Sequence, residues 1–238
     1  MSTSADHAKM VAARHAVSAL TSERRIALGT GSTAAFAVRA LAERFPHGTG
    51  FEFVASSRAT EELARSLGLS VRALRGDDRF DIMLDGADEV TPSLDLTKGG
   101  GGALFREKFL ARLSRRLVIM VDPSKLVDHL GTRHRIPIEV VPFARDVLIR
   151  RLADDGFDAR LRSDPTGGPM RTDNGNEVLD LAPAARVDDP RALDAALRGL
   201  PGVVETGIFP SMTDLAVVGF EDGHVEERPA RSQANRRR

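Results

Sequence analysis

Residue types and spacings single out a few short segments that could do chemistry. In Gly29-Thr30-Gly31-Ser32-Thr33-Ala34, glycines permit a tight turn and hydroxyl side chains follow. A helix that begins here presents unpaired N–H groups, which favours a phosphate-binding loop over a simple capped turn. The glycine spacing also fits a dinucleotide fingerprint, which needs an acid about 20 residues later. The segment found there, Ser56-Ser57-Arg58, disfavours NAD and leaves NADP as an alternative.

A second segment, Asp85-Gly86-Ala87-Asp88-Glu89, places three acids directly after an apolar run. Ligands of open parallel sheets bind outside the carboxyl ends of the strands, so these acids are candidates for contacts with sugar hydroxyls. A Mg²⁺ site and a solvated acidic turn are the alternatives, because hard oxygen ligands suit Mg²⁺.

A third segment begins at Lys98, continues through Gly99–Gly102 and enters a helical pattern that contains Glu107. Four consecutive glycines lose much backbone entropy on ordering. They therefore indicate close approach of backbone N–H groups to a ligand rather than a flexible linker. Glu107 could pair with its neighbours Arg106 and Lys108.

The remaining polar candidates carry weaker signals. Lys125, in Val121-Asp122-Pro123-Ser124-Lys125-Leu126, follows another apolar run and could reach the same rim of the sheet. No histidine has metal-ligand spacing, so we assign all of them to surface or structural positions and expect no metal. These are His7, His15, His47, His129, His134 and His224.

The first part of the chain alternates short apolar strands with helical patterns, which predicts a parallel sheet with helices on both faces. The expected strands are 25–28, 51–55, 71–74, 80–84 and 117–121, and the expected helices are 5–20, 32–44, 59–67 and from the glycines to about residue 114.

From residue 135 the order becomes β-α-β-β-α-β, which predicts a ferredoxin-like unit. Its expected strands are 136–141, 157–162, 177–181 and 203–209, and its expected helices are 143–153 and 189–200. A strand at 215–220 then returns to the first domain. We therefore expect an α/β protein with a Rossmann-like catalytic domain (1–134 plus 210–227), a smaller ferredoxin-like α+β domain (135–209) inserted near the C-terminus, and a disordered basic tail (228–238).

Bulk composition excludes several classes. Hydrophobic residues make up 42%, charged residues 29%, the formal net charge is zero and there is no cysteine. This composition is typical of a globular protein without disulfides or thiol chemistry. A net charge of zero also gives no overall electrostatic attraction to nucleic acid or to an anionic membrane. We find no signal peptide and no apolar run long enough for a membrane span. We expect a cytoplasmic protein.

In order and separation, these segments resemble ribose-5-phosphate isomerase of type A, from about Lys9 to Gly219. The similarity rests on Gly29–Ala35, Ser56–Thr60, Asp85–Glu89, Lys98–Gly101 through Arg106-Glu107-Lys108, Asp122–Lys125, Pro137–Val141, Thr172–Asn176, and Leu200–Val204 with Gly207. Gly102 stands where the family often has Ala, and the arginine-rich tail lies outside the pattern.

The resemblance implies an aldose–ketose isomerase that interconverts D-ribose 5-phosphate and D-ribulose 5-phosphate, in the non-oxidative branch of the pentose phosphate pathway. It implies proton transfer through an ene-diolate, no cofactor, and a homo-oligomer, with a dimer favoured. Glu107 looks like the base, assisted by Lys98, Asp85 and Asp88. The implied substrate-binding residues are Thr30, Gly31, Ser32, Thr33, Gly86, Ala87, Gly99, Gly100, Gly101 and Lys125.

Three other classes stay open. A CoA-transferase-like enzyme could use a glutamate after a glycine loop as a nucleophile. A sugar-phosphate-sensing regulator could share the pocket, although the short stretch before Arg25 leaves no room for a DNA-binding helix-turn-helix segment. An NADP-dependent dehydrogenase is the third.

Overall fold

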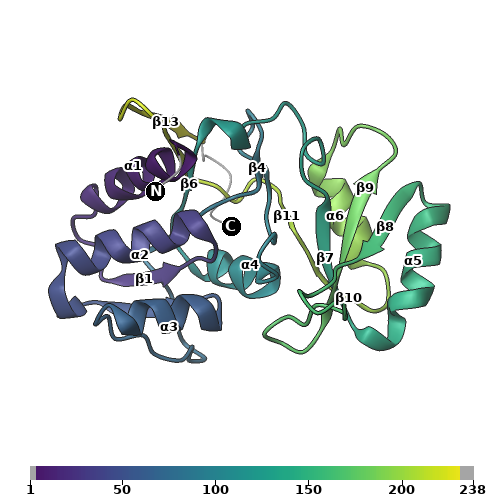
Figure 1. Cartoon of the computed structure of the whole chain (residues 1–238), viewed down its shortest axis with the longest axis horizontal. Helices are drawn as coiled ribbons and strands as arrows, with labels where there is room; N and C mark the ends of the chain where they lie inside the picture. Colours follow the sequence, from purple (N-terminus) through teal and green to yellow (C-terminus); the bar gives the residue numbers. More distant parts are fainter. Residues whose placement is uncertain (1–3, 231–238) are drawn as a thin grey trace. The chain divides into compact units, whose positions relative to one another are not determined.

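The computed structural model describes residues 4–230, which divide into two compact units (Figure 1). The first unit comprises Met1–Gly86, Leu110–Ser124 and Ser211–Arg238, as far as these are described. The second comprises Ala87–Phe109 and Lys125–Pro210. Among residues 4–230, no helix combines the length and the apolar character needed to cross a bilayer.

The first unit contains a sheet in the order β13-β12-β6-β3-β1-β2. Its strands are β1 (Arg25–Leu28), β2 (Glu52–Ala55), β3 (Ile82–Asp85), β6 (Leu117–Val121), β12 (Leu215–Gly219) and β13 (Val225–Pro229). Every neighbouring pair is parallel except β12 and β13. All of β6 is buried, as expected for a central parallel strand whose side chains are covered on both faces.

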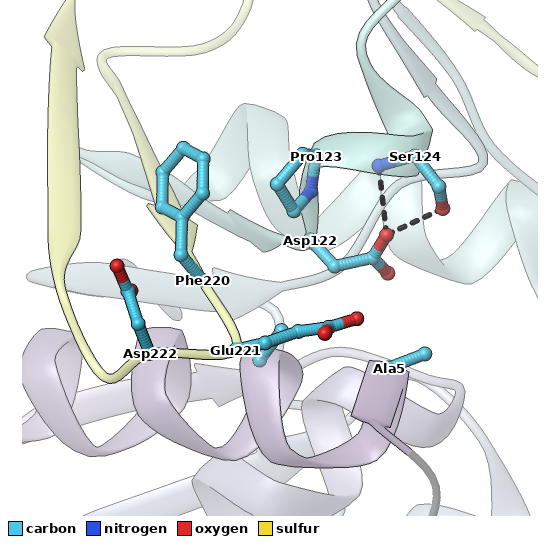
Figure 2. A pocket seen from close by; sticks show the side chains of 8 residues that line it. Ala5, Asp122, Pro123, Ser124, Phe220, Glu221 and Asp222 are labelled. Atoms are coloured by element: carbon cyan, nitrogen blue, oxygen red, sulfur yellow. Dashed lines mark hydrogen bonds between the residues drawn. The ribbon is translucent and has the colours of Figure 1, made fainter.

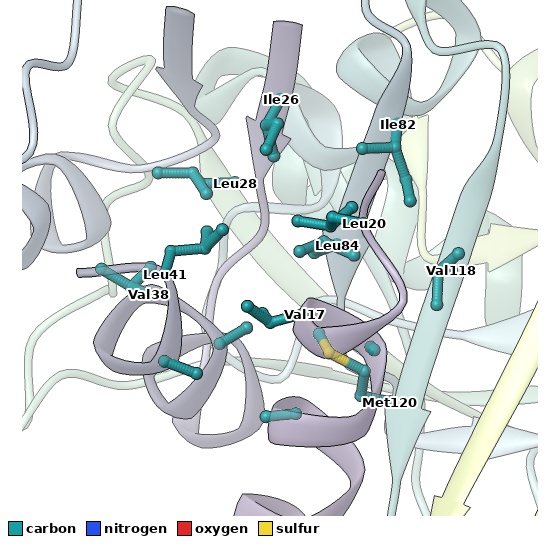
Figure 3. Close-up of a cluster of buried hydrophobic side chains, with 14 of the residues drawn as sticks. Val17, Leu20, Ile26, Leu28, Val38, Leu41, Ile82, Leu84, Val118 and Met120 are labelled. Atoms are coloured by element: carbon teal, nitrogen blue, oxygen red, sulfur yellow. The ribbon is translucent and has the colours of Figure 1, made fainter. Parts of the chain in front are cut away.

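Helices α1 (Ser4–Ser18) and α2 (Ser32–Arg44) lie side by side in the first unit, and α3 (Arg58–Ser66) adjoins α2. Alternate side chains of the strands meet these helices in one apolar cluster (Figure 3). Leu28 and Met120 contribute from strands, and Val17 and Leu41 contribute from helices. This core fixes the carboxyl ends of β1 and β3, where two of the chemical segments begin.

The second unit contains an antiparallel sheet in the order β10-β7-β9-β8. Its strands are β7 (Ile136–Val140), β8 (Phe157–Leu161), β9 (Glu177–Pro183) and β10 (Val203–Thr206). Helices α5 (Arg145–Asp154) and α6 (Pro190–Arg198) complete the β-α-β-β-α-β order. Ile138 and Leu179 of the sheet share one core with Leu148 of α5 and Leu197 of α6. The predicted fold class, a parallel-sheet domain with a ferredoxin-like α+β domain, is confirmed.

A small sheet, β11-β5-β4, also belongs to the second unit and was not expected. It is built from β4 (Glu89–Val90), β5 (Leu96–Thr97) and β11 (Ile208–Phe209). Helix α4 (Leu104–Leu113) follows β5, and short 3₁₀ turns occur at Pro46–Gly48, Pro123–Lys125 and Pro142–Ala144. The division between the units falls within α4.

Two expected strands differ in the structure. The strand expected at 71–74 is reduced to a single bridge between Val71 and Phe53. The strand expected at 203–209 is two strands in different sheets, separated at Gly207. A Cβ at Gly207 would lie 2.2 Å from the Lys98 carbonyl oxygen, so the chain turns between sheets where only a glycine fits.

The disordered tail was expected to begin at Arg228, but the structure continues the sheet past this residue. Arg228 and Pro229 belong to β13, where they pair with Ala216 and Leu215 of β12. Val225 and Arg228 are half-buried, so charged residues continue the sheet as an edge strand that tolerates a terminal proline. Residues 231–238 lie outside the described part of the chain.

Candidate active site

Two hydrogen bonds of Thr30 fix the turn between β1 and α2, and no side chain caps the start of α2. The Thr30 N–H donates to Asp85 Oδ1 at 3.2 Å, and the Thr30 hydroxyl lies 2.7 Å from Ser56 Oγ. Gly31, with φ of 104°, is the N-cap of α2 and supplies no side-chain cap. The N–H groups of the first helical turn therefore remain for solvent or an anion. Ser32 begins the helix and is exposed.

Asp85, at the carboxyl end of β3, is fully buried and fixes this turn. Its Oδ1 accepts hydrogen bonds from the N–H groups of Gly86, at 2.8 Å, and Thr30. A Cβ at Gly29 would lie 2.0 Å from the same oxygen, so a glycine is required there. Thr33 is buried, and a Cβ at Gly86 would lie 3.4 Å from the Thr33 Cβ. The structure thus brings the phosphate-loop candidates together with Asp85 and Gly86.

The acidic segment continues into the second unit, where its members differ in role. Ala87 and Asp88 are half-buried. Asp88 donates its N–H to the Thr97 carbonyl oxygen, and its Oδ2 accepts the Gly100 N–H, each at 2.8 Å. Glu89 is fully buried and accepts hydrogen bonds from the Thr97 hydroxyl and from the N–H groups of Gly131, Arg133 and His134. Glu89 is therefore structural, whereas Asp88 borders the glycine segment.

Lys98 and Glu107 form a buried ion pair. Lys98 Nζ lies 3.3 Å from Glu107 Oε1, and the two side chains are 3% and 4% exposed. The backbone places both groups: the Lys98 N–H donates to the Gly207 carbonyl oxygen after β5, and Glu107 occupies the first turn of α4. Desolvation offsets most of the attraction in a buried pair, so such a pair is weak evidence for stability. Stability alone therefore does not explain why these two charges are buried together.

Arg106 does not pair with Glu107, contrary to expectation. Its Nε donates to Asn174 Oδ1 at 2.8 Å and its Nη2 to the Asp173 carbonyl oxygen at 3.0 Å. Residues 172–176, which contain these partners of Arg106, are also hydrogen-bonded to the fully buried Glu139. Glu139 Oε1 accepts hydrogen bonds from the side chains of Thr172, Asn174 and Asn176 at 2.9, 3.0 and 2.8 Å.

Lys108 likewise turns away from Glu107. Its Nζ lies 2.9 Å from Asp194 Oδ1 and 2.8 Å from Glu205 Oε1, and it donates to the Thr206 hydroxyl. Burial lowers the pKa of Lys108, and the carboxylates of Glu205 and Asp194 oppose that shift. Both neighbours of Glu107 therefore anchor the first half of α4 to the ferredoxin-like part of the second unit.

Lys125 is placed at the 3₁₀ turn Pro123–Lys125, and its Nζ lies 3.4 Å from His134 Nε2. Across residues 4–230, no group of three or more His, Asp or Glu side chains is arranged to hold a metal ion. This finding offers no support to the Mg²⁺ alternative for the acidic segment.

A cavity of about 480 Å³ lies elsewhere in the first unit (Figure 2). Its lining includes the carboxylates of Asp122, Glu221 and Asp222, beside Phe220. The Asp122 carboxylate accepts hydrogen bonds from the N–H and hydroxyl of Ser124. Three carboxylates around one cavity repel a phosphate, so this cavity is no candidate for a sugar phosphate.

Comparisons with known proteins agree on one family. The sequence model of "Ribose 5-phosphate isomerase A (phosphoriboisomerase A)" matches residues 52–223. The chain is 49% identical over 219 residues to ribose-5-phosphate isomerase A of Thermomicrobium roseum, covering 92% of each chain. The chain belongs to the ribose 5-phosphate isomerase A family.

Solved structures of the isomerase A family share the fold. One, of D-ribose-5-phosphate isomerase in complex with phospho-erythronic acid, has a TM-score of 0.90 at 36% identity and covers 94% of this chain and 99% of that one. Another, ribose 5-phosphate isomerase from Plasmodium falciparum, has a TM-score of 0.90 at 32% identity and covers 95% and 100%. The predicted resemblance is confirmed, and the CoA-transferase, regulator and dehydrogenase alternatives are not favoured.

Sequence reasoning missed residues that hold the glycine segment of this isomerase A chain. Arg162 contacts that segment and is itself held by Asp180, and neither residue stands in a recognisable motif. The resemblance singled out Thr172–Asn176 but not the partner of that segment, Arg106. Nothing in the sequence distinguished Glu139 from the other residues of its strand.

Proposed function

We propose that this chain interconverts D-ribose 5-phosphate and D-ribulose 5-phosphate in the non-oxidative branch of the pentose phosphate pathway. Family membership gives the substrate, and the observation that carries the chemistry is the buried pair of Lys98 and Glu107 beside four glycines. A carboxylate and an ammonium at 3.3 Å provide one group to accept a proton and one to stabilise negative oxygen.

In the proposed reaction, the Glu107 carboxylate removes the hydrogen from C2 of the open-chain aldose. The electrons of that bond form the C1–C2 double bond of an ene-diolate, and negative charge develops on O1. Lys98 donates a proton to O1 and accepts the proton of O2, while Glu107 returns its proton to C1. A positioned general base typically contributes about 10²–10⁴-fold to the rate. The hydrogen moves within the substrate, so the proposal includes no cofactor and no metal.

We assign the phosphate to the β1–α2 turn, at Thr30, Gly31, Ser32 and Thr33. The uncapped first turn of α2 supports this assignment because its N–H groups and partial positive charge suit an anion. Binding energy at the phosphate can hold the sugar in a reactive pose.

We assign the sugar hydroxyls to Asp88, Gly86, Ala87 and the glycine segment, with Lys125 as a further substrate contact. Asp88 is more accessible than fully buried Asp85. The proposal therefore gives Asp88 the larger part in proton exchange during ring opening, and gives Asp85 the task of holding Thr30 and Gly86 in place.

We further propose a cytoplasmic homodimer with no nucleic-acid partner. Zero net charge supports the last point. Support for self-association comes from apolar side chains exposed on the second unit: Phe143 is 98% exposed, Val147 74% and Val141 41%. Exposed apolar residues gathered on one part of a chain are typical of protein interaction sites.

Proton NMR of the purified protein with ribose 5-phosphate in D₂O tests the proposed reaction. We expect ribulose 5-phosphate to appear, and its C1 to carry deuterium where the proton on Glu107 exchanges with solvent. Unphosphorylated D-ribose is the matched control and should react far more slowly, because it lacks the anion that the β1–α2 turn binds. Failure to form the ketose would contradict the proposal.

A further inference from the structure

Two carbonyl oxygens of the glycine segment converge on one side chain. Arg162 Nη1 donates to the Gly99 carbonyl oxygen at 2.7 Å and to the Gly100 carbonyl oxygen at 2.9 Å. The Gly99 oxygen also accepts the Gly102 N–H at 2.9 Å, which closes a tight turn. A single guanidinium therefore determines the direction of two consecutive peptide groups.

Arg162 is itself held in a fixed orientation. It follows β8, and Asp180 of the neighbouring strand β9 accepts hydrogen bonds from its Nε, at 2.9 Å, and from its Nη2. The two side chains are 16% and 20% exposed. A planar guanidinium bound by both oxygens of one carboxylate leaves its remaining corner pointing in a defined direction. That corner meets the glycine segment.

Because Arg162 fixes the direction of two carbonyl groups, it also fixes the direction of the N–H groups in the same peptides. In a trans peptide the C=O and the N–H point in opposite directions. The N–H groups that share peptides with the two held carbonyls are those of Gly100 and Gly101, so both point away from Arg162. The Gly100 N–H donates to Asp88 Oδ2 at 2.8 Å. The Gly101 N–H makes no hydrogen bond to any residue in the described range.

We infer that Arg162, fixed by Asp180, is a positioning residue that aims the Gly101 N–H at the substrate and the Gly100 N–H at Asp88. The inference rests on the proposed function: the Gly101 N–H faces the oxygen that becomes negative in the ene-diolate, and the Gly100 N–H orients Asp88. Glycines have no side chains to restrain them and lose much entropy on ordering. An external clamp on their carbonyls makes the donors available without reorganisation during the reaction.

Lysine cannot replace Arg162 in this role. Its ammonium carries the same charge but lacks the planar fork that holds a carboxylate and two carbonyls together. In Arg162→Lys, the glycine segment should keep its net electrostatic environment and lose its defined orientation. The effect should therefore be larger on stabilisation of negative oxygen than on binding of the uncharged parts of the substrate.

The experiment compares Arg162→Lys and Asp180→Asn with the control Arg160→Lys. Arg160 lies within β8, two residues before Arg162; its side chain is 68% exposed and pairs with Asp158. The measurements are kcat and KM for ribose 5-phosphate, the melting temperature, and the affinities for two ligands by calorimetry. The ligands are 4-phospho-erythronic acid and erythritol 4-phosphate, which differ only in a carboxylate against a CH₂OH group.

We expect both test variants to lower kcat by about 10- to 100-fold, less than the 10²–10³-fold typical of removing an oxyanion donor outright. KM should change by less than about threefold, and affinity for the acid should fall about tenfold while affinity for the alcohol holds. Arg160→Lys should match the parent protein in every measurement.

The outcomes separate this inference from the proposed function. An inactive parent protein refutes the proposed function. An active parent with an unchanged kcat in Arg162→Lys and Asp180→Asn refutes the positioning role. Equal loss of affinity for both ligands also refutes it, because a general structural defect does not distinguish a carboxylate from an alcohol. If Arg162→Lys fails to fold, Asp180→Asn decides by the same criteria.

Discussion

Glu107 and Lys108 are consecutive residues of α4, yet each binds an opposite charge in a different place. Glu107 meets Lys98, whereas Lys108 meets Asp194 and Glu205. The helix thus carries one ion pair assigned to chemistry and one that anchors it. Substitutions at the two positions should have separable effects, on turnover and on stability.

Glu107→Gln should lower kcat for ribose 5-phosphate by about 10²–10⁴-fold, because the amide cannot accept the C2 proton. KM should change little, since the proposal assigns the phosphate to the β1–α2 turn. Glu43→Gln is the control, because Glu43 is exposed and pairs with Arg14. Steady-state kinetics of both variants check the prediction, and near-parental turnover by Glu107→Gln would remove Glu107 from its role.

Lys108→Met should lower the free energy of unfolding by about 3 kcal/mol, because it leaves two buried carboxylates without their cation. This is the low end of the usual range, since Arg198 still lies near both carboxylates. Urea unfolding measures the loss. Adding Glu205→Gln should recover part of it, and a double variant no more stable than Lys108→Met would contradict the explanation.

Thr33→Val should raise KM for ribose 5-phosphate by about tenfold with little change in kcat, because a hydrogen bond to a charged group contributes about 1.5–3 kcal/mol. Valine keeps the shape and removes only the hydroxyl. Thr49→Val, at an exposed position, is the control. A fall in kcat at constant KM would place Thr33 near the reacting carbons instead.

Asp78 gives a prediction for acid stability. Hydrogen bonds from Arg72 hold the pKa of Asp78 at about 2, against an ordinary value of 3.8. A carboxyl whose pKa is lowered on folding stabilises the protein above its unfolded pKa, and that contribution is lost as the pH falls toward 2. Asp78→Asn should therefore cost about 2 kcal/mol at pH 7 and almost nothing near pH 2. Denaturant titrations at both pH values measure the loss, with Asp77→Asn at the exposed neighbouring position as the control. An equal loss at pH 7 and near pH 2 for Asp78→Asn would contradict the explanation.

Phe143→Asp should convert the proposed dimer into a monomer, because a charge would replace a nearly fully exposed apolar side chain at the proposed interface. Light scattering after size exclusion measures the mass. Leu74→Asp, which changes an exposed apolar residue of the first unit, is the control and should leave the mass unchanged. A parent protein that is already monomeric would contradict the dimer.

Much of the parallel sheet could be predicted because its signals are local. The residue ranges Arg25–Leu28, Ser32–Arg44 and Leu117–Val121 agree with the structure, since each apolar or amphipathic pattern is bounded by glycine, proline or charge. The two-residue strands β4 and β5 are too short to show a period. β13 was missed because its alternating side chains are largely charged, as suits an exposed edge.

The candidate site also contains features that could be predicted from the sequence and features that could not. The glycine turns and the acidic segment were visible in the sequence because each motif is contiguous. The contacts of three basic residues could not be predicted. The partners of Arg106 and Lys108 lie more than sixty residues away in the chain. The partner of Arg162 lies on the neighbouring strand. Such contacts depend on how the ferredoxin-like sheet folds, and no local pattern encodes them.

The missing side chain at Gly29 links two positions that are far apart in the chain. The carboxylate of Asp85 fills the volume that any Cβ at position 29 would need. A side chain at position 29 should therefore be tolerated only where residue 85 is smaller than aspartate. Covariation between columns 29 and 85 in a family alignment, or joint recovery from a two-site library, would reveal this dependence without an activity assay.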